Sequence, residues 1–100
     1  GDVYKRQAPD AVCDELVYRV EFPERPGALL KFLSGLGQRW NISMFHYRNH
    51  GAAYGRILVG VQVPVKERRA FKKVLGEINY RYWEETDNRA YQLYLAQRRD

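Results

Sequence analysis

Residues 16–37 read LVYRVEFPERPGALLKFLSGLG and hold a strand, a turn and a helix in immediate succession. In the first seven residues every second side chain is apolar and two of those between are charged, which is typical of a strand with one buried face. A Pro-Gly turn follows, and apolar residues then recur at the spacing of a helix. The segment therefore predicts a strand over 16–22 and a helix that begins at Pro26 and ends near Gly37.

The rest of the chain repeats this order. The further elements expected are strands at 42–48, 56–63 and 80–86, a helix through 71–78 with a basic outer face, and one or two helical turns in 90–96. Two βαβ halves, each with a right-handed crossover, then interleave into one β-α-β-β-α-β chain. The sequence predicts an α+β, ferredoxin-like fold, in which a four-stranded antiparallel sheet carries two helices on one face and leaves the other face bare.

The strand at 42–48 is apolar on both sides. Phe45 and Tyr47 share one face, and Met44 and His46 share the other. A strand of this kind leaves apolar surface uncovered in a single domain, so we expect its outer face or edge to meet another domain or subunit.

Composition indicates one cytoplasmic domain. A chain of 100 residues with 45% apolar residues can fill one core but not two. We divide it into a linker or truncated segment at 1–14, a domain at 15–96 and a tail at 97–100. The single cysteine, Cys13, allows no intrachain disulfide, and no apolar run reaches the roughly 18 residues of a membrane helix.

Several function classes find little support. The net charge is +5, but most arginines are spread singly among acidic residues, whereas a nucleic-acid footprint gathers its cations on one face. An RNA-binding module of this fold needs aromatic residues on the third strand, where Gly60 and Gln62 stand. Cys13 has no nearby histidine, and His46 and His50 have no cysteine at metal spacing, so we expect no catalytic residues, no metal and no nucleic acid.

Two places suit an amino-acid ligand. Gly27 lies at a strand-helix junction, where backbone N–H groups can receive a carboxylate; the alternative is a simple turn. Arg48 can clamp a carboxylate with two hydrogen bonds, and His46 lies two residues earlier on the same strand face. We expect their strand to lie beside the first. The alternative is an exposed arginine and an interface histidine.

Two long motifs, FPERPGALL at 22–30 and RWNISMFHYRNHG at 39–51, resemble the C-terminal regulatory region of biosynthetic threonine dehydratases (threonine ammonia-lyases). The resemblance runs over about residues 8–96 and includes EETDN at 84–88. It implies an ACT-like subdomain, the second of two, that follows a catalytic domain carrying pyridoxal phosphate. The chain would then be a fragment of an enzyme, with no cofactor of its own.

The same resemblance implies feedback inhibition by isoleucine, with valine as antagonist, in a homotetrameric enzyme. Its partners would be the preceding subdomain and the catalytic domain. The effector-binding residues it implies are Gly27, Ala28, Leu29, His46 and Arg48. Leu29 is equally suited to contact an aliphatic side chain or to join the core. The alternative function is a structural subdomain that supports assembly and holds no ligand.

Overall fold

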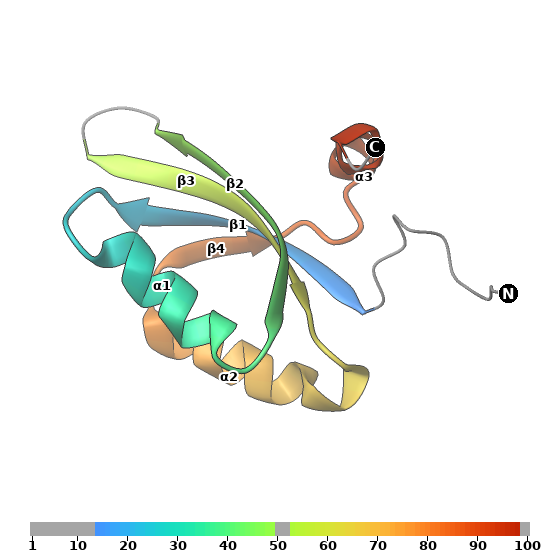
Figure 1. Cartoon of the computed structure of the whole chain (residues 1–100), viewed down its shortest axis with the longest axis horizontal. Coiled ribbons are helices and arrows are strands. Elements are labelled where there is room, and N and C mark those ends of the chain that lie inside the picture. Colours follow the sequence, from blue (N-terminus) through green and yellow to red (C-terminus); the bar gives the residue numbers. More distant parts are fainter. Residues whose placement is uncertain (1–13, 50–52, 99–100) are drawn as a thin grey trace, which may run out of the picture.

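The computed structural model describes residues 14–49 and 53–98, so Cys13 and His50 lie outside the described residues. The elements, in chain order, are β1 (Glu15–Pro23), α1 (Ala28–Gly37), β2 (Asn41–Asn49), β3 (Tyr54–Gln62), a 3-10 turn η1 (Val65–Glu67), α2 (Arg68–Ile78), β4 (Arg81–Glu84) and α3 (Arg89–Arg98). This order confirms the predicted β-α-β-β-α-β fold, and the helical turns expected near the end of the chain form a third helix. Figure 1 shows α1 and α2 together on one side of the sheet.

The four strands form one antiparallel sheet in the order β2-β3-β1-β4. β1 and β3 are central and pair along their whole lengths, from Glu15 opposite Gln62 to Pro23 opposite Tyr54. The expectation that the second strand lies beside the first is wrong. Because the two βαβ halves interleave, β3 takes the place next to β1 and moves β2 to the edge.

The core lies between the sheet and the helices α1 and α2. Alternate residues of β1, from Leu16 to Phe22, point into it, as the period of two requires. Alternate residues from Ile57 of β3 to Val63, directly after that strand, do the same. The ring of Phe71 in α2 packs against the ring of Tyr18, with 5.6 Å between the ring centres, and edge-on against Trp40, with 5.2 Å between the ring centres. Burial, helped by the nearby Glu84, raises the pKa of Tyr18, so its hydroxyl stays protonated.

The opposite face of the sheet is not bare. α3 lies over one end of it, where Tyr91 and Tyr94 pack against Val17 and Leu58. Asn88 starts this helix, because its side-chain oxygen accepts hydrogen bonds from the amides of Ala90 and Tyr91, at 2.9 and 3.3 Å. The sequence predicted only one or two turns here, because the apolar residues of this segment lie on all sides of the helix and give no helical period.

The first helix begins at Ala28, two residues after Pro26. Gly27 adopts a left-handed conformation with φ of 84° and serves as the residue that caps the helix. A glycine takes this conformation without strain, whereas a side chain there would be strained. Pro26 and Gly27 therefore belong to the turn, and the helix starts two residues later than the sequence predicted.

We expect Phe71→Ala to lower the free energy of unfolding by about 3 to 5 kcal/mol, because it empties the centre of the aromatic core. Leu93→Ala, on an exposed face of α3, is the matched control and should change it by less than about 0.5 kcal/mol. Urea unfolding of both variants measures the difference. Equal costs for the two changes would contradict this core.

We also expect the chain to self-associate through β2, where Phe45 and Tyr47 are 41% and 42% exposed on an edge strand. Phe45→Lys should weaken the association without unfolding the domain. Val65→Lys, at a 69% exposed site in η1, adds the same charge elsewhere and should leave it unchanged. Sedimentation velocity compares the three proteins; a monomeric parent at high concentration would overturn the expectation.

Candidate functional site

The structure divides the five sequence-predicted site residues between two faces of the sheet. His46 and Arg48 project from the helix-free face, opposite Leu58 and Arg56 of β3. Gly27, Ala28 and Leu29 lie on the other side, at the start of α1, with Ala28 buried in the core. Within one chain, a ligand the size of an amino acid cannot touch both groups.

A β-bulge in β2 causes this division. The pairing with β3 shifts register between Ile42 and Met44. β2 therefore contains one extra residue at this point, and the alternation of its side chains between the two faces is interrupted. Ile42 packs against the core beneath the helices, and simple alternation would put His46 and Arg48 on that same side. The shift turns them to the helix-free face and brings Phe45 and Tyr47 to the helix side.

The β1–α1 turn offers unpaired donors. The backbone N–H groups of Leu29 and Leu30 have no hydrogen-bond partner among the described residues, as expected for the first turn of a helix. Leu30 is 68% exposed, whereas Leu29 packs against the core. The hydroxyl of Tyr80, the residue before β4, donates to the carbonyl of Ala28 at 3.1 Å and so holds the start of the helix.

A carboxylate lies three residues before the capping glycine. Glu24 accepts hydrogen bonds from the Tyr47 hydroxyl and from the Asn49 side-chain amide, the latter at 2.7 Å. Among the described residues no cation pairs with Glu24. The bond to Glu24 raises the pKa of Tyr47, so that hydroxyl remains a donor. We call Glu24, Tyr47, Asn49 and the amides of Leu29 and Leu30 the turn cluster.

Sequence reasoning missed Glu24, Tyr47 and Asn49. The motif around Gly27 pointed to the turn, but Arg48 was preferred on β2 because its charge suits a carboxylate. Tyr47 could have been identified if the face of the sheet on which it lies had been known. That face depends on a bulge, which the alternation of apolar and polar residues does not reveal.

Charges cross the helix-free face in one row. Arg81, Glu21, Arg56 and Arg48 stand opposite one another on β4, β1, β3 and β2. Glu21 contacts both Arg56, at 3.3 Å, and Arg81, at 3.5 Å. Arg48 forms no hydrogen bond or ion pair with any described residue. The row therefore carries a net positive charge at the β2 side.

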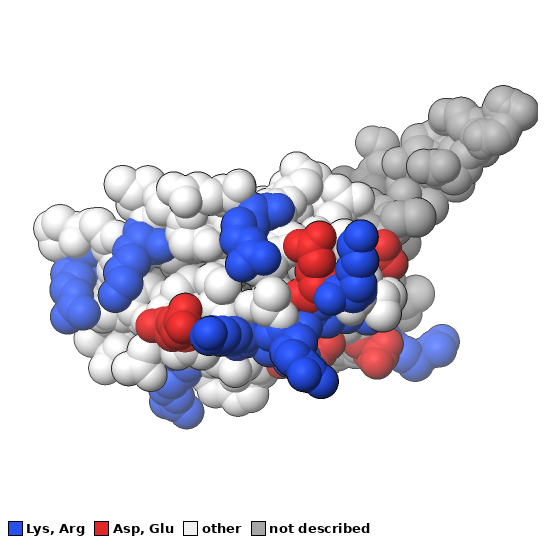
Figure 2. All heavy atoms as spheres, turned by 90° about the horizontal axis from the view of Figure 1, so that it is seen from below, with Lys and Arg blue, Asp and Glu red and all other residues white. Residues whose placement is uncertain are grey.

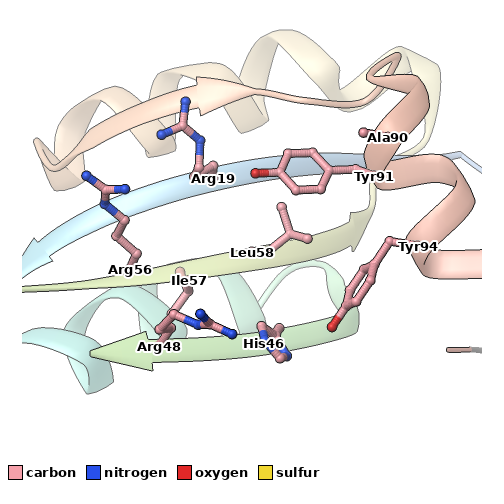
Figure 3. A pocket seen from close by; sticks show the side chains of 9 residues that line it. All are labelled: Arg19, His46, Arg48, Arg56, Ile57, Leu58, Ala90, Tyr91 and Tyr94. Atoms are coloured by element: carbon pink, nitrogen blue, oxygen red, sulfur yellow. The ribbon is translucent and has the colours of Figure 1, made fainter. Parts of the chain in front are cut away.

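A cavity of about 410 Å³ opens beside this row, between the sheet and α3 (Figure 3). Its lining consists of Arg19, His46, Arg48, Arg56, Ile57, Leu58, Ala90, Tyr91 and Tyr94. Tyr91 and Tyr94 reach over it from α3, and the ring of Tyr94 meets His46 edge-on at 6.0 Å. We call this cavity the α3 pocket.

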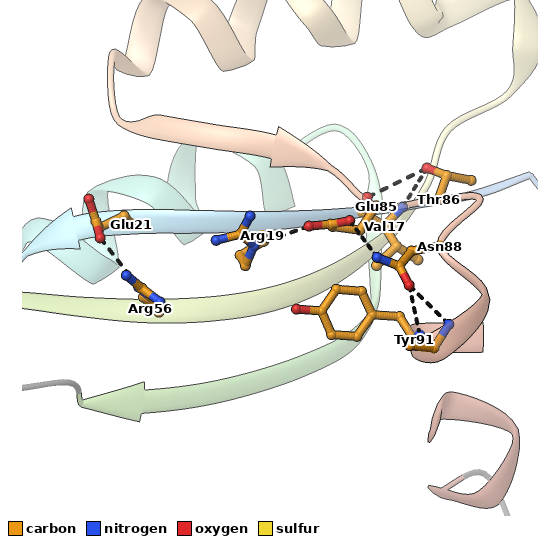
Figure 4. A network of polar contacts seen from close by, with 9 residues as sticks. Val17, Arg19, Glu21, Arg56, Glu85, Thr86, Asn88 and Tyr91 are labelled. Carbon is orange, nitrogen blue, oxygen red and sulfur yellow. Dashed lines mark hydrogen bonds and ion pairs between the residues drawn. The ribbon is translucent and has the colours of Figure 1, made fainter. Parts of the chain in front are cut away.

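Acidic residues fix two of its arginines from outside (Figure 4). The Nε–H of Arg19 donates to Glu85 at 3.1 Å, and Glu85 also accepts from the Asn88 side chain at 3.0 Å. The network thus joins the pocket wall to the cap of α3. The guanidinium of Arg19 lies 4.3 Å from the centre of the Trp83 ring, which holds its plane.

Other kinds of site find no support in residues 14–49 and 53–98. Their histidines and acids form no group that could hold a metal ion. None of their helices is long and apolar enough to cross a membrane. On the side seen in Figure 2, lysines and arginines are interrupted by acidic and uncharged residues and do not merge into one basic surface.

Comparison with known proteins gives a consistent result. Residues 9–95 match the family described as the C-terminal regulatory domain of threonine dehydratase. The chain is 55% identical over 83 residues to the biosynthetic L-threonine dehydratase IlvA of Burkholderia multivorans and 51% identical over 84 residues to the mitochondrial threonine dehydratase of Saccharomyces cerevisiae. These alignments cover 83% and 84% of the chain but only 16% and 15% of the relatives.

The Escherichia coli enzyme IlvA gives the same picture, with 47% identity over 88 residues, 88% of this chain and 17% of that enzyme. Among solved structures, the ligand-free regulatory subunit of aspartate kinase from Thermus thermophilus aligns with a TM-score of 0.56 at 20% identity, over 76% of this chain and 53% of that one. That likeness shows an ACT-like fold. The chain belongs to the family of C-terminal regulatory domains of threonine dehydratase.

Proposed function

We propose that the chain binds a branched-chain amino acid and transmits the binding to a threonine dehydratase, with isoleucine as feedback inhibitor and valine as antagonist. The family supports a regulatory role within a longer enzyme, and the chain spans about one sixth of the relatives that it matches. The names of those relatives place them in biosynthesis. An end product is the natural effector of such an enzyme.

The observation that carries this proposal is that one turn holds a carboxylate with no cation partner and two backbone N–H groups with no acceptor among the described residues. A free amino acid presents an ammonium and a carboxylate on one carbon atom. The carboxylate of Glu24 suits the ammonium, and the N–H groups of Leu29 and Leu30, at the positive end of α1, suit the carboxylate. The exposed side chain of Leu30 offers apolar surface for an aliphatic side chain.

In this proposal the effector-binding site, which we call the seat, is formed by the turn cluster and the backbone of Gly27, Ala28 and Leu29. Gly27 shapes the turn, Ala28 anchors it to Tyr80, and Leu29 supplies an amide while its side chain stays in the core. His46 and Arg48 do not join this seat, because they project from the other face of the sheet.

The effector acts by preferring one quaternary state of the enzyme. Tight binding alone shifts no equilibrium, so the seat must differ between the less active and the more active states. The position of the binding site supports a difference between the two states, because Tyr47 belongs to the edge strand where we expect a neighbouring domain or subunit. The preceding subdomain, the catalytic domain and the other copies of a homotetramer are the proposed neighbours.

We assign pyridoxal phosphate to the catalytic domain outside this chain. The cofactor needs an enclosed lysine amine for its Schiff base. Of the described residues, Lys31, Lys66, Lys72 and Lys73 are all exposed on helical segments and do not fit this need. A cytoplasmic location is part of the same proposal and rests on the composition of the chain.

A structural role without ligand is the second candidate, and the exposed aromatic residues at the β2 side favour it. Phe45 and Tyr47 present apolar surface that assembly would cover. This role predicts that isoleucine binds elsewhere in the enzyme and that the turn cluster can be changed without effect on inhibition.

We expect Glu24→Gln, made in the full-length enzyme, to weaken isoleucine inhibition roughly ten- to a hundredfold. The loss of one charge-assisted hydrogen bond typically costs about 1.5 to 3 kcal/mol. Glu77→Gln, which removes the same charge from the exposed surface of α2, should leave the inhibition curve unchanged. Threonine turnover at increasing isoleucine concentrations measures both.

Arg48→Ala decides between the two faces. If it relieves inhibition while Glu24→Gln does not, the effector lies in the α3 pocket and the proposed seat is wrong. If neither variant alters inhibition or the heat of isoleucine binding, the structural role gains.

A further inference from the structure

Two arginines stand directly opposite each other on the helix-free face. Arg48 of β2 pairs in register with Arg56 of β3, and side chains at such positions are about 4.5 to 5.5 Å apart at their β-carbons. Like charges at this spacing destabilise a sheet. Glu21 compensates Arg56 and also contacts Arg81, so no described acid remains for Arg48.

The α3 pocket opens at this uncompensated charge. Four of its lining residues can carry positive charge, and they come from three strands: Arg19, His46, Arg48 and Arg56. No acidic residue lines it. Glu85 and Glu21 each contact the Nε of their arginine, so the terminal nitrogens of Arg19 and Arg56 remain available to a ligand.

The row of charges determines how much negative charge the pocket needs. Arg19 is balanced by Glu85, whereas Arg56 shares Glu21 with Arg81, which lies outside the pocket, and Arg48 has no described acid. Arg48 and Arg56 are therefore two positive charges at the pocket that Glu21 does not fully balance. A single carboxylate would balance only one of them, and the ammonium of an amino acid would lie among cations with no acid in the lining.

We propose that the α3 pocket binds a small dianion, a phosphate monoester or a dicarboxylate, at a site separate from the amino-acid seat. The guanidinium groups of Arg48 and Arg56 suit two oxygen atoms of one anionic group, because each presents a planar fork of donors. Leu58, Ala90 and the rings of Tyr91 and Tyr94 cover an apolar part of the ligand. Through Glu85 and Asn88 the anion also stabilises the start of α3.

Direct binding to the chain tests the proposal, with inorganic phosphate and malonate as dianions and acetate as monoanion, at constant ionic strength. We expect phosphate or malonate to raise the melting temperature saturably and to shift the NMR signals of the Arg48 and Arg56 Nε–H groups. Acetate should bind at least tenfold more weakly. The stronger of the two dianions identifies the ligand as a phosphate ester or a dicarboxylate.

Arg48→Ala should weaken binding of the dianion at least tenfold and, without anion, melt at or above the temperature of the parent chain, because it removes the opposed like charge. Arg39→Ala removes the same charge from an arginine that stacks on Trp40, away from the pocket, and should bind as the parent does. Equal weakening in both variants, or shifts that never saturate, would show charge screening only and overturn the site.

Isoleucine is the remaining probe. Isoleucine that saturates the Arg48 signals and competes with phosphate would also overturn the proposal, since one site would then serve the amino acid. Loss of isoleucine inhibition in Glu24→Gln together with normal phosphate binding keeps both sites. If phosphate does not bind but Glu24→Gln still loses isoleucine inhibition, the proposed anion site is wrong and the proposed amino-acid site stands.

Discussion

The antiparallel pairing of β1 with β3 is the interaction on which the other features of the domain depend. It places Tyr18 opposite Val59 and Arg19 opposite Leu58, so it separates an apolar face from a charged one along the centre of the sheet. The apolar face receives α1 and α2. The charged face is left for ion pairs and for α3, and both candidate sites take their positions from this division.

The bulge in β2 then determines which polar side chains lie on each face of the sheet. Without it, Arg48 would turn toward α1, and Tyr47 would turn away from Glu24. With it, the helix side gains an acid held by two neutral donors, and the helix-free side gains a second arginine beside Arg56. One inserted residue near Ser43 thus separates a seat for a zwitterion from a pocket for an anion. Ser43 itself donates to Glu15 at 2.6 Å, which holds the bulge in place.

Much of the fold could be predicted from the sequence, because alternation and helical spacing are strong in β1, β3, α1 and α2. The order of elements, the helix-covered face and the glycine turn followed from these local patterns. The position of β2 and the length of α3 did not, since they depend on pairing and packing between distant segments. For the site, the motif around Gly27 located the turn, whereas Glu24 and Tyr47 became visible only once the register was known.

A crystal structure of the full-length enzyme grown with isoleucine tests the central claim most directly, because the two faces of this sheet are easily distinguished. We expect isoleucine beside the β1–α1 turn, with its ammonium on Glu24 and its carboxylate on the amides of Leu29 and Leu30. Isoleucine bound between Arg48 and α3, or a turn cluster covered by a neighbouring domain with no ligand in it, would show that the proposed binding site is wrong.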